Sequence, residues 1–273
     1  MAYKVIDIYK DLPRTNCGDC GKASCFAFAS AVYLEAFPLR GCPYLDGDRL
    51  LAMEARLEQG RDKGEGRRPA SSEQALRALL AGLNDADLAA LADNCGGVYV
   101  AGPEEGVRVP FLDGLYLITR EDVVAVRGEP PTVWVKVFLL IYLTRASGRA
   151  EAGVWVSYRD LPSSVSKAAS FEECAAGIAE AFAGEIMGLD QAVRALGGAP
   201  SKAASADRVH RLQALPRVGV LLLFWDEEVE FSARASLLVD RNVLDYLDQE
   251  ALVFLGEALE QRLRGRDLGE LVG

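Results

Sequence analysis

The stretch Leu12–Pro43 reads LPRTNCGDCGKASCFAFASAVYLEAFPLRGCP. It holds four of the six cysteines of the chain, spaced C-x2-C-x4-C-x16-C with a proline after the last: Cys17, Cys20, Cys25 and Cys42. Glycines between the first three thiols, Gly18 and Gly21, allow the backbone to approach the sulfurs closely. The apolar run Phe26–Phe37 predicts a helix that leads away from this loop, and Cys42 brings the chain back to close one compact metal centre.

The ligand type and spacing limit which metal this segment can bind. Thiolates are soft ligands, and four of them select zinc or an iron–sulfur cluster. A zinc site usually takes its ligands from two short pairs, whereas here one pair is joined by a nearby third cysteine and a distant fourth. This asymmetry favours a 4Fe–4S cluster over zinc. A disulfide framework is the weakest alternative, because the thiols are crowded and we expect no secretory signal.

This segment resembles the small four-cysteine 4Fe–4S domain at the start of the large subunit of the corrinoid iron–sulfur protein. The same module occurs in the B subunit of the Rnf electron-transport complex. The similarity covers about the first 45 residues and rests on these positions: Pro13, Thr15, Asn16, Cys17, Gly18, Cys20, Gly21, Cys25, Phe28, Ala29, Cys42 and Pro43. It implies that the four cysteines are the cluster ligands, one per iron. It does not imply a corrinoid-binding barrel, since nothing later in the chain has that pattern.

The net charge and the length of the apolar runs limit the classes of function further. The 273 residues carry 30 Lys plus Arg against 40 Asp plus Glu, a net charge of −10, which disfavours nucleic-acid binding. Such a charge serves solubility, and it can also steer a basic redox partner protein onto the surface. The longest apolar run, Val133–Leu143, is interrupted by Lys136 and is too short to span a membrane. We therefore expect a cytoplasmic protein.

Patterning predicts two units and an α+β fold. Residues 1–60 form a small helical iron–sulfur module, in which Tyr3–Tyr9 is a strand or a helix and Asp46–Gln59 is a helix that ends at Gly60. The charged, glycine-rich stretch 60–72 is expected to be a linker. Residues 72–265 form a mixed α+β domain.

Helical periodicity and alternating apolar residues divide the second domain into elements. Helices are expected over 72–83, 84–92, 133–145, 171–187, 189–196, 243–246 and 249–264. Strands are expected over 98–101, 107–111, 116–119, 123–126, 154–158 and 218–225, the last a central strand. A strand remains the alternative for 133–145, and 207–212 is ambiguous. Asp113-Gly114 is a hairpin turn signal.

The second unit also resembles a domain family of unknown function found in anaerobes, whose members often follow such a cluster domain. The similarity covers roughly residues 72–262 and rests on VWVSYRDLP, PRVGVLLLFWDEEVEF, ASLLVD and LDYLDQEAL. It implies a two-part architecture and no activity. Where the family pattern leads us to expect a glycine-containing turn, this chain has Asp226-Glu227.

Polar residues of the second unit offer candidate chemistry. Its densest carboxylate group can hold a hard metal ion, act as acid and base, or be a solvated loop: Asp226, Glu227, Glu228, Glu230 and Asp240. Arg159 and Arg217 lie in predicted turns and can form an anion site. His210 is the single histidine, which excludes a poly-histidine metal site. Cys95 and Cys174 are isolated and are expected to be buried thiols.

Three functions are consistent with this sequence. The favoured one is single-electron transfer by one 4Fe–4S cluster in anaerobic, corrinoid or one-carbon metabolism, with the second unit binding a redox protein partner or a small ligand. The first alternative is an enzyme whose site near the cluster is lined by Arg159, Arg217 and Asp226–Glu230. The second is a scaffold in which the metal is purely structural. The donor, the acceptor and the oligomeric state are left open by the sequence.

Overall fold

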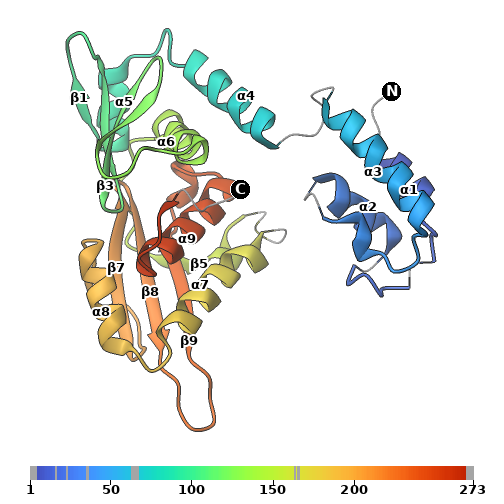
Figure 1. Cartoon of the computed structure of the whole chain (residues 1–273). Coiled ribbons are helices and arrows are strands. Elements are labelled where there is room, and N and C mark those ends of the chain that lie inside the picture. The colour runs from blue at the N-terminus through green and yellow to red at the C-terminus, as the bar shows by residue number, and fades with distance from the viewer. Residues whose placement is uncertain are drawn as a thin grey trace. The chain divides into compact units, whose positions relative to one another are not determined.

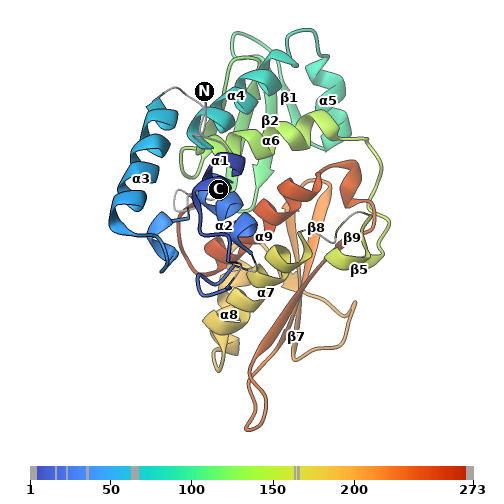
Figure 2. The ribbon, with the colours of Figure 1, turned by 90° about the vertical axis from the view of Figure 1, so that its right-hand side faces the viewer.

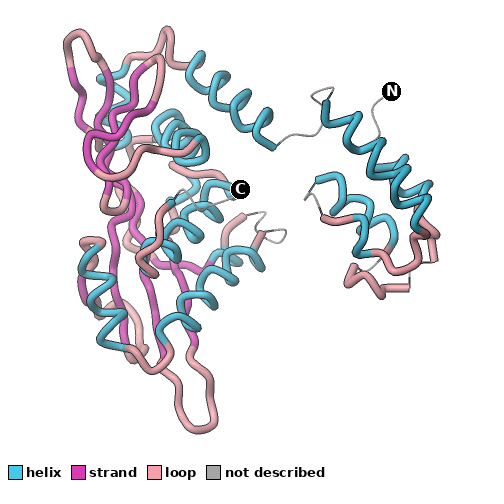
Figure 3. The backbone as a smooth tube through the Cα atoms, viewed as in Figure 1, coloured by secondary structure: helices cyan, strands magenta, loops and turns pink. Residues whose placement is uncertain are grey.

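The computed structural model describes residues 5–15, 17–22, 24–34, 37–62, 68–162, 164 and 167–268. The chain divides into two compact units, Met1–Glu73 and Gln74–Gly273 (Figure 1). The described part of the first unit is helical, whereas the second combines helices with two antiparallel sheets (Figure 3). The predicted α+β class is therefore confirmed.

The first unit is built from short helices around a small core. Its elements are α1 (Val5–Asp11), α2 (Cys25–Leu34), the 3-10 turn η1 (Leu39–Gly41) and α3 (Gly47–Asp62). For Tyr3–Tyr9 the sequence left strand and helix open, and the structure shows a helix from Val5 onward. The helix predicted over Phe26–Phe37 is shorter: Phe37 is no longer helical, and residues 35–36 lie outside the described part.

The expected linker is partly helical. Helix α3 continues through Gly60 to Asp62, because one glycine costs only about 1 kcal/mol in a helix whose neighbours are good helix formers. Helix α4 (Arg68–Ala81) begins before the predicted start at residue 72. The prediction of a linker over 60–72 is thus wrong at both ends, and residues 63–67 lie outside the described part.

The remaining helices of the second unit lie where the sequence predicts helices, although several of their ends differ by a few residues from the predicted limits. They are α5 (Leu88–Cys95), α6 (Val133–Arg145), α7 (Ala168–Phe182), α8 (Ile186–Ala195) and α9 (Gln249–Leu263), with 3-10 turns η2 (Tyr158–Asp160) and η3 (Val243–Asp245). Two predictions fail locally. Asp87 rather than Asn84 caps α5, by accepting from two backbone N–H groups. The helix predicted through Met187 stops at Phe182, because Gly184 takes a left-handed φ of +71°.

A four-stranded antiparallel sheet follows α5. Its order is β1 (Val98–Val100), β2 (Gly106–Phe111), β3 (Gly114–Thr119) and β4 (Val123–Arg127), and each of these strands lies where the sequence predicts one. The hairpin turn lies one residue earlier than expected, at Leu112-Asp113, since Phe111 pairs with Gly114 and Leu112 takes a φ of +50°. Helix α6 lies on one side of this sheet (Figures 1 and 2).

The second sheet has five strands in the order β5-β9-β8-β7-β6. They are β5 (Trp155–Ser157), β6 (Ala199–Pro200), β7 (Arg208–Leu215), β8 (Val218–Trp225) and β9 (Arg234–Asp240). The prediction of 218–225 as the central strand is confirmed, and the ambiguous 207–212 belongs to a strand. Helices α7, α8 and α9 cover one face (Figure 2). The other face has its own small apolar cluster around Leu221 and Leu223.

None of the helices in the described part of the chain combines the length and the apolar character that a bilayer crossing requires. Helix α6 is apolar but has only 13 residues, and Phe138, Leu139 and Leu140 on it are buried in the core of the second unit.

The close approach of β2 and β3 at Gly106 predicts a sharp stability effect. A Cβ added at Gly106 would lie 2.5 Å from the carbonyl oxygen of Ile118, where the backbone cannot move away. We expect Gly106→Ala to lower the free energy of unfolding by about 1–3 kcal/mol, measured by chemical denaturation.

Gly188 provides the matched control for that substitution. It lies inside α8, and a Cβ there would meet its nearest atoms at ordinary contact distances of 3.8 Å and more. Gly188→Ala should be neutral or stabilise the protein by up to about 1 kcal/mol. Equal stability of the two variants would contradict the packing described for Gly106.

Candidate functional site

The four cysteines of the first unit lie in the loop before α2, at the start of α2 and directly after η1. Cys17 is exposed, Cys20 is half-buried, and Cys25 and Cys42 are buried. Cys25 is the first residue of α2, and Cys42 follows directly after η1. The segment therefore presents thiols both to solvent and to the interior of the unit.

Two glycines shape the loop between the first cysteines. Gly18 and Gly21 both take left-handed φ values, +82° and +76°, that other residues adopt at a cost. The N–H of Gly21 donates to the carbonyl oxygen of Gly18 at 2.9 Å, which closes a tight turn around Cys20. These two glycines therefore let the backbone turn twice between Cys17 and Cys25.

Cys25 is positioned by the start of α2. The Ser24 carbonyl oxygen accepts from Phe28 N–H at 2.9 Å, and the Ser24 Oγ accepts from Ala27 N–H at 3.1 Å. Ser24 therefore caps the helix and places Cys25 in its first turn.

Cys42 follows a closely packed segment of backbone at Gly41. A Cβ at Gly41 would lie 2.7 Å from the Phe37 ring, so a larger residue would require that ring to shift. Phe37 in turn packs edge-on against Phe28 of α2, with ring centroids 5.7 Å apart. Cys42 N–H donates to the Leu39 carbonyl oxygen at 3.2 Å, which completes η1.

Three of the four thiols lie in or against the core of the first unit. Cys25 and Cys42 are members of its buried cluster, and Cys20 packs against that cluster; its other buried members are Ile8, Leu12, Phe28, Ala29, Val32, Leu39 and Met53. Among the described residues, no three Cys, His, Asp or Glu side chains are close enough to share a single metal ion. All four thiols belong to this one small unit, and their role as the ligands of one metal centre stays a prediction.

Tyr44 joins the two ends of the cysteine segment. Its hydroxyl donates to Asp19 Oδ2 at 2.6 Å, so the loop between Cys17 and Cys20 is tied to the chain just after Cys42. The hydrogen bond to Asp19 and the charge of that carboxylate raise the pKa of Tyr44, and Cys17 and Cys42 contribute to the same shift. This contact was missed by sequence reasoning, which had no signal to pair Asp19 with Tyr44.

The polar candidates of the second unit do not form one site. Arg217 immediately precedes β8 and Asp226 immediately follows it, so the length of the strand, about 25 Å, separates them. Arg159 is paired with Glu172 on α7, and this interaction raises the pKa of Arg159 and lowers that of Glu172. The predicted grouping of Arg159, Arg217 and Asp226–Glu230 in one site is wrong, because β8 holds two of its parts at opposite ends.

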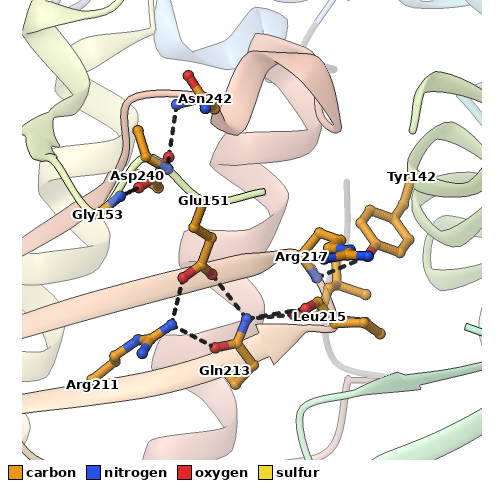
Figure 4. A network of polar contacts seen from close by, with 11 residues as sticks. Tyr142, Glu151, Gly153, Arg211, Gln213, Leu215, Arg217, Asp240 and Asn242 are labelled. Atoms are coloured by element: carbon orange, nitrogen blue, oxygen red, sulfur yellow. Dashed lines mark hydrogen bonds and ion pairs between the residues drawn. The ribbon is translucent and has the colours of Figure 1, made fainter. Parts of the chain in front are cut away.

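The carboxylate group of the second unit also separates. Asp226 accepts from Gly184 N–H at 2.8 Å and so anchors the base of the β8–β9 hairpin, while the glutamates project into the loop beyond it. Asp240 is buried at the far end of β9, where it accepts from the backbone of Ala152, Gly153 and Asn242 (Figure 4). Grouping Asp240 with Asp226 was therefore wrong.

The single histidine and the two isolated cysteines of the second unit are buried in its interior. His210 is buried and its Nε2 lies 2.8 Å from Asp190 Oδ1. Burial raises the pKa of the Cys95 thiol and raises that of Cys174 to about 12, so both are unreactive core thiols, as expected.

One polar network of the second unit was not predicted. Glu151 accepts from Arg211 and from Gln213 Nε2, the latter at 3.0 Å, and holds the loop before β5 against β7 (Figure 4). Periodicity carries no signal for this pairing, since 60 and 62 residues separate the partners along the chain.

The contact between Tyr44 and Asp19 makes a testable prediction. Asp19→Asn should lower the pKa of Tyr44 toward about 10, because the raising charge is removed. Tyr99, whose pKa is raised by Glu105, is the matched control and should be unaffected by Asp19→Asn but lowered by Glu105→Gln. Titration of the tyrosine ring carbons by NMR reports both, and an unchanged Tyr44 in Asp19→Asn would contradict this contact.

Comparison with known proteins identifies relatives of both units. Residues 12–44 match the family described as "Putative Fe-S cluster", and residues 87–262 match the "Domain of unknown function (DUF3786)" family. No solved structure matches the chain.

Matches among curated proteins are confined to a short segment. The gamma subunit of the acetyl-CoA decarbonylase/synthase complex of Methanothermobacter thermautotrophicus is 43 % identical over 54 residues, 20 % of this chain and 12 % of that protein. The corrinoid/iron-sulfur protein large subunit of Moorella thermoacetica is 40 % identical over 50 residues, 18 % of this chain and 11 % of that protein. The chain thus spans about an eighth of the length of these relatives.

Both resemblances inferred from the sequence are confirmed by these matches, which also support an iron–sulfur cofactor for the first unit. Because the second family match covers more than half of its length, the chain belongs to the DUF3786 family, with an iron–sulfur segment at its N-terminal side.

Proposed function

We propose that Cys17, Cys20, Cys25 and Cys42 bind one 4Fe–4S cluster and that the protein transfers single electrons to or from a protein partner. The observation that carries the proposal is the position of three of the four thiols at one small core, with Cys25 and Cys42 inside it and Cys20 against it, while Cys17 is exposed on the same unit. Four cysteine thiolates are the ligand set of such a cluster, which supplies one-electron chemistry when bound.

The residues around the thiols suit this role. Cys25 lies at the N-terminal end of α2, where the helix dipole stabilises negative charge. Phe28 and Met53 are buried in the same core and exclude water from one side. Cys17 is exposed, so the other side faces solvent, where a partner can approach. Burial and hydrogen bonding of the sulfurs are the means by which a protein tunes a cluster potential.

The proposed division of labour follows from the two units. Residues 1–60 act as the cluster-binding module, and residues 72–265 act as the domain that binds the partner or a small ligand. The net charge of −10 favours a basic redox partner by electrostatic steering. The relatives named above are subunits of a decarbonylase/synthase complex and a corrinoid protein, which supports a place in anaerobic one-carbon metabolism.

The test is an anaerobic purification with iron and sulfide analysis, followed by EPR before and after dithionite. We expect about four irons and four sulfides per chain and a signal that appears on reduction. Cys42→Ser should lose cluster. Cys95→Ala and Cys174→Ala, which remove buried thiols of the other unit, are the matched controls and should retain it.

Two outcomes would overturn the proposal. Zinc in place of iron, or iron without a redox response, would leave a scaffold with a structural metal. Equal iron content in Cys42→Ser and the two control variants would show that other residues bind the metal.

A further inference from the structure

The connection between β8 and β9, residues 226–233, extends beyond the other strands and helices of the second unit (Figures 1 and 2). At its end lie the two most exposed large apolar side chains among the described residues. Val229 is 105 % exposed, as in an extended chain without neighbours, and Phe231 is 67 % exposed. A single exposed apolar residue is ordinary on a protein surface, but two on one projecting turn favour a contact with another molecule.

The turn at this end is not built from turn-forming residues. The Glu228 N–H donates to the Phe231 carbonyl oxygen at 2.8 Å and the Phe231 N–H donates to the Glu228 carbonyl oxygen at 3.2 Å, so Val229 and Glu230 form a two-residue turn. Turns of this length favour glycine, asparagine or aspartate with a positive φ, but no residue of 226–233 is a glycine or takes a positive φ. Because a β-branched valine does not help to form the turn, its presence there favours a role in contact.

The base of the connection is fixed to the rest of the second unit. The Asp226 N–H donates to Asp207 Oδ2 at 2.8 Å, and Asp226 Oδ1 accepts from the Gly184 N–H at 2.8 Å. Where the strands end, Trp225 pairs with Arg234, whose guanidinium lies 4.9 Å from the centroid of the Trp225 ring. The exposed turn is therefore presented on a held base, which reduces the conformational entropy that binding would cost.

The charges around the two apolar side chains all have one sign. Residues 226–233 contain one aspartate, three glutamates and no lysine or arginine. Glu228 and Glu230, on either side of Val229, are exposed and have no ion-pair partner in the part of the chain that the structure describes. Asp226 accepts from backbone N–H groups, and no three acidic, histidine or cysteine side chains among the described residues are placed to share a metal ion. The free carboxylates therefore suit cationic side chains rather than a metal.

We propose that this hairpin tip, defined by Glu228, Val229, Glu230 and Phe231, docks into an apolar pocket bordered by lysine or arginine residues on a partner protein. The pocket takes up the valine and the phenylalanine, and the basic rim pairs with the two glutamates. A bilayer is the less favourable occupant, because anionic lipids repel the carboxylates. The tip belongs to the second unit, which has a core of its own, so this proposal does not rest on cluster binding by the first unit.

The docking should be weak and dependent on salt. A tip of four residues covers far less than the roughly 800 Å² per partner of a standard interface. Its glutamates are exposed, so their pairs with a basic rim are screened as the ionic strength rises.

The experiment uses random peptides displayed on phage, because such a library reports which chemistry the tip selects. The full chain, purified anaerobically, and its Val229→Ser/Phe231→Ser variant are panned in parallel at low salt. We expect peptides that combine lysine or arginine with aromatic or aliphatic residues to be enriched on the wild type alone. By calorimetry, a synthetic copy of such a peptide should bind this variant and Glu228→Lys/Glu230→Lys at least tenfold more weakly, and should bind the wild type more weakly at high salt.

Control variants separate docking from folding and from cluster binding. Val124→Ser/Val126→Ser replaces valines of β4 that are 44 % and 46 % exposed, and it should bind the peptide as the wild type does. The tip variants replace exposed side chains, so their unfolding midpoints should match that of the wild type. Their iron content should also be unchanged, so a failure of this proposal is distinguishable from a failure of the proposed electron transfer.

Several outcomes would overturn the proposal. One is the lack of a peptide class specific to the wild type, or a class without basic residues, or a peptide that the charge variant binds equally well. Another is flotation of the wild type, but not of Val229→Ser/Phe231→Ser, with vesicles of phosphatidylcholine with or without phosphatidylserine, which would identify a membrane surface. A third is self-association in sedimentation velocity that the same variant abolishes, since the occupant would then be a second copy of this chain.

Discussion

The burial of strand β8 is the constraint on which the second unit depends. All but the last of its eight residues are buried, and it is hydrogen-bonded to β7 on one side and β9 on the other. Apolar clusters form on both faces of the sheet around it, one beneath the helices and one beneath Trp155 and Trp225. Because β8 runs through the whole sheet, it also separates Arg217 from Asp226 and decides that the polar groups at its ends cannot act together.

The first unit is organised differently, because its candidate ligands are part of its core. A unit of this size buries little apolar surface, and Cys25 and Cys42 contribute to the little it has. Binding of a cofactor to these thiols would also cross-link the core, so we expect cofactor loading to be coupled to folding of this unit. The second unit has a core of its own and does not depend on that coupling.

Local sequence signals predicted most helices and strands of the second unit, and the predictions that failed have identifiable causes. The apolar run Val133–Arg145 was correctly expected to be a helix and β8 to be central. The helix predicted through Met187 was wrong because Gly184, which takes a left-handed conformation and donates its N–H to Asp226, ends it early. The pairings of Asp19 with Tyr44 and of Glu151 with Arg211 join distant residues, and no local pattern predicts them.

By itself, the sequence determined the chemistry of this protein: four soft thiol donors in one segment, the glycines that bend it, and the division into a helical unit and an α+β unit. Residue type and spacing suffice for this because ligand softness and helix or strand periodicity are local properties. Only the tertiary structure decided which polar residues meet and that Asp240 supports a loop. These depend on strand register and burial, which arise from contacts between residues far apart in the chain.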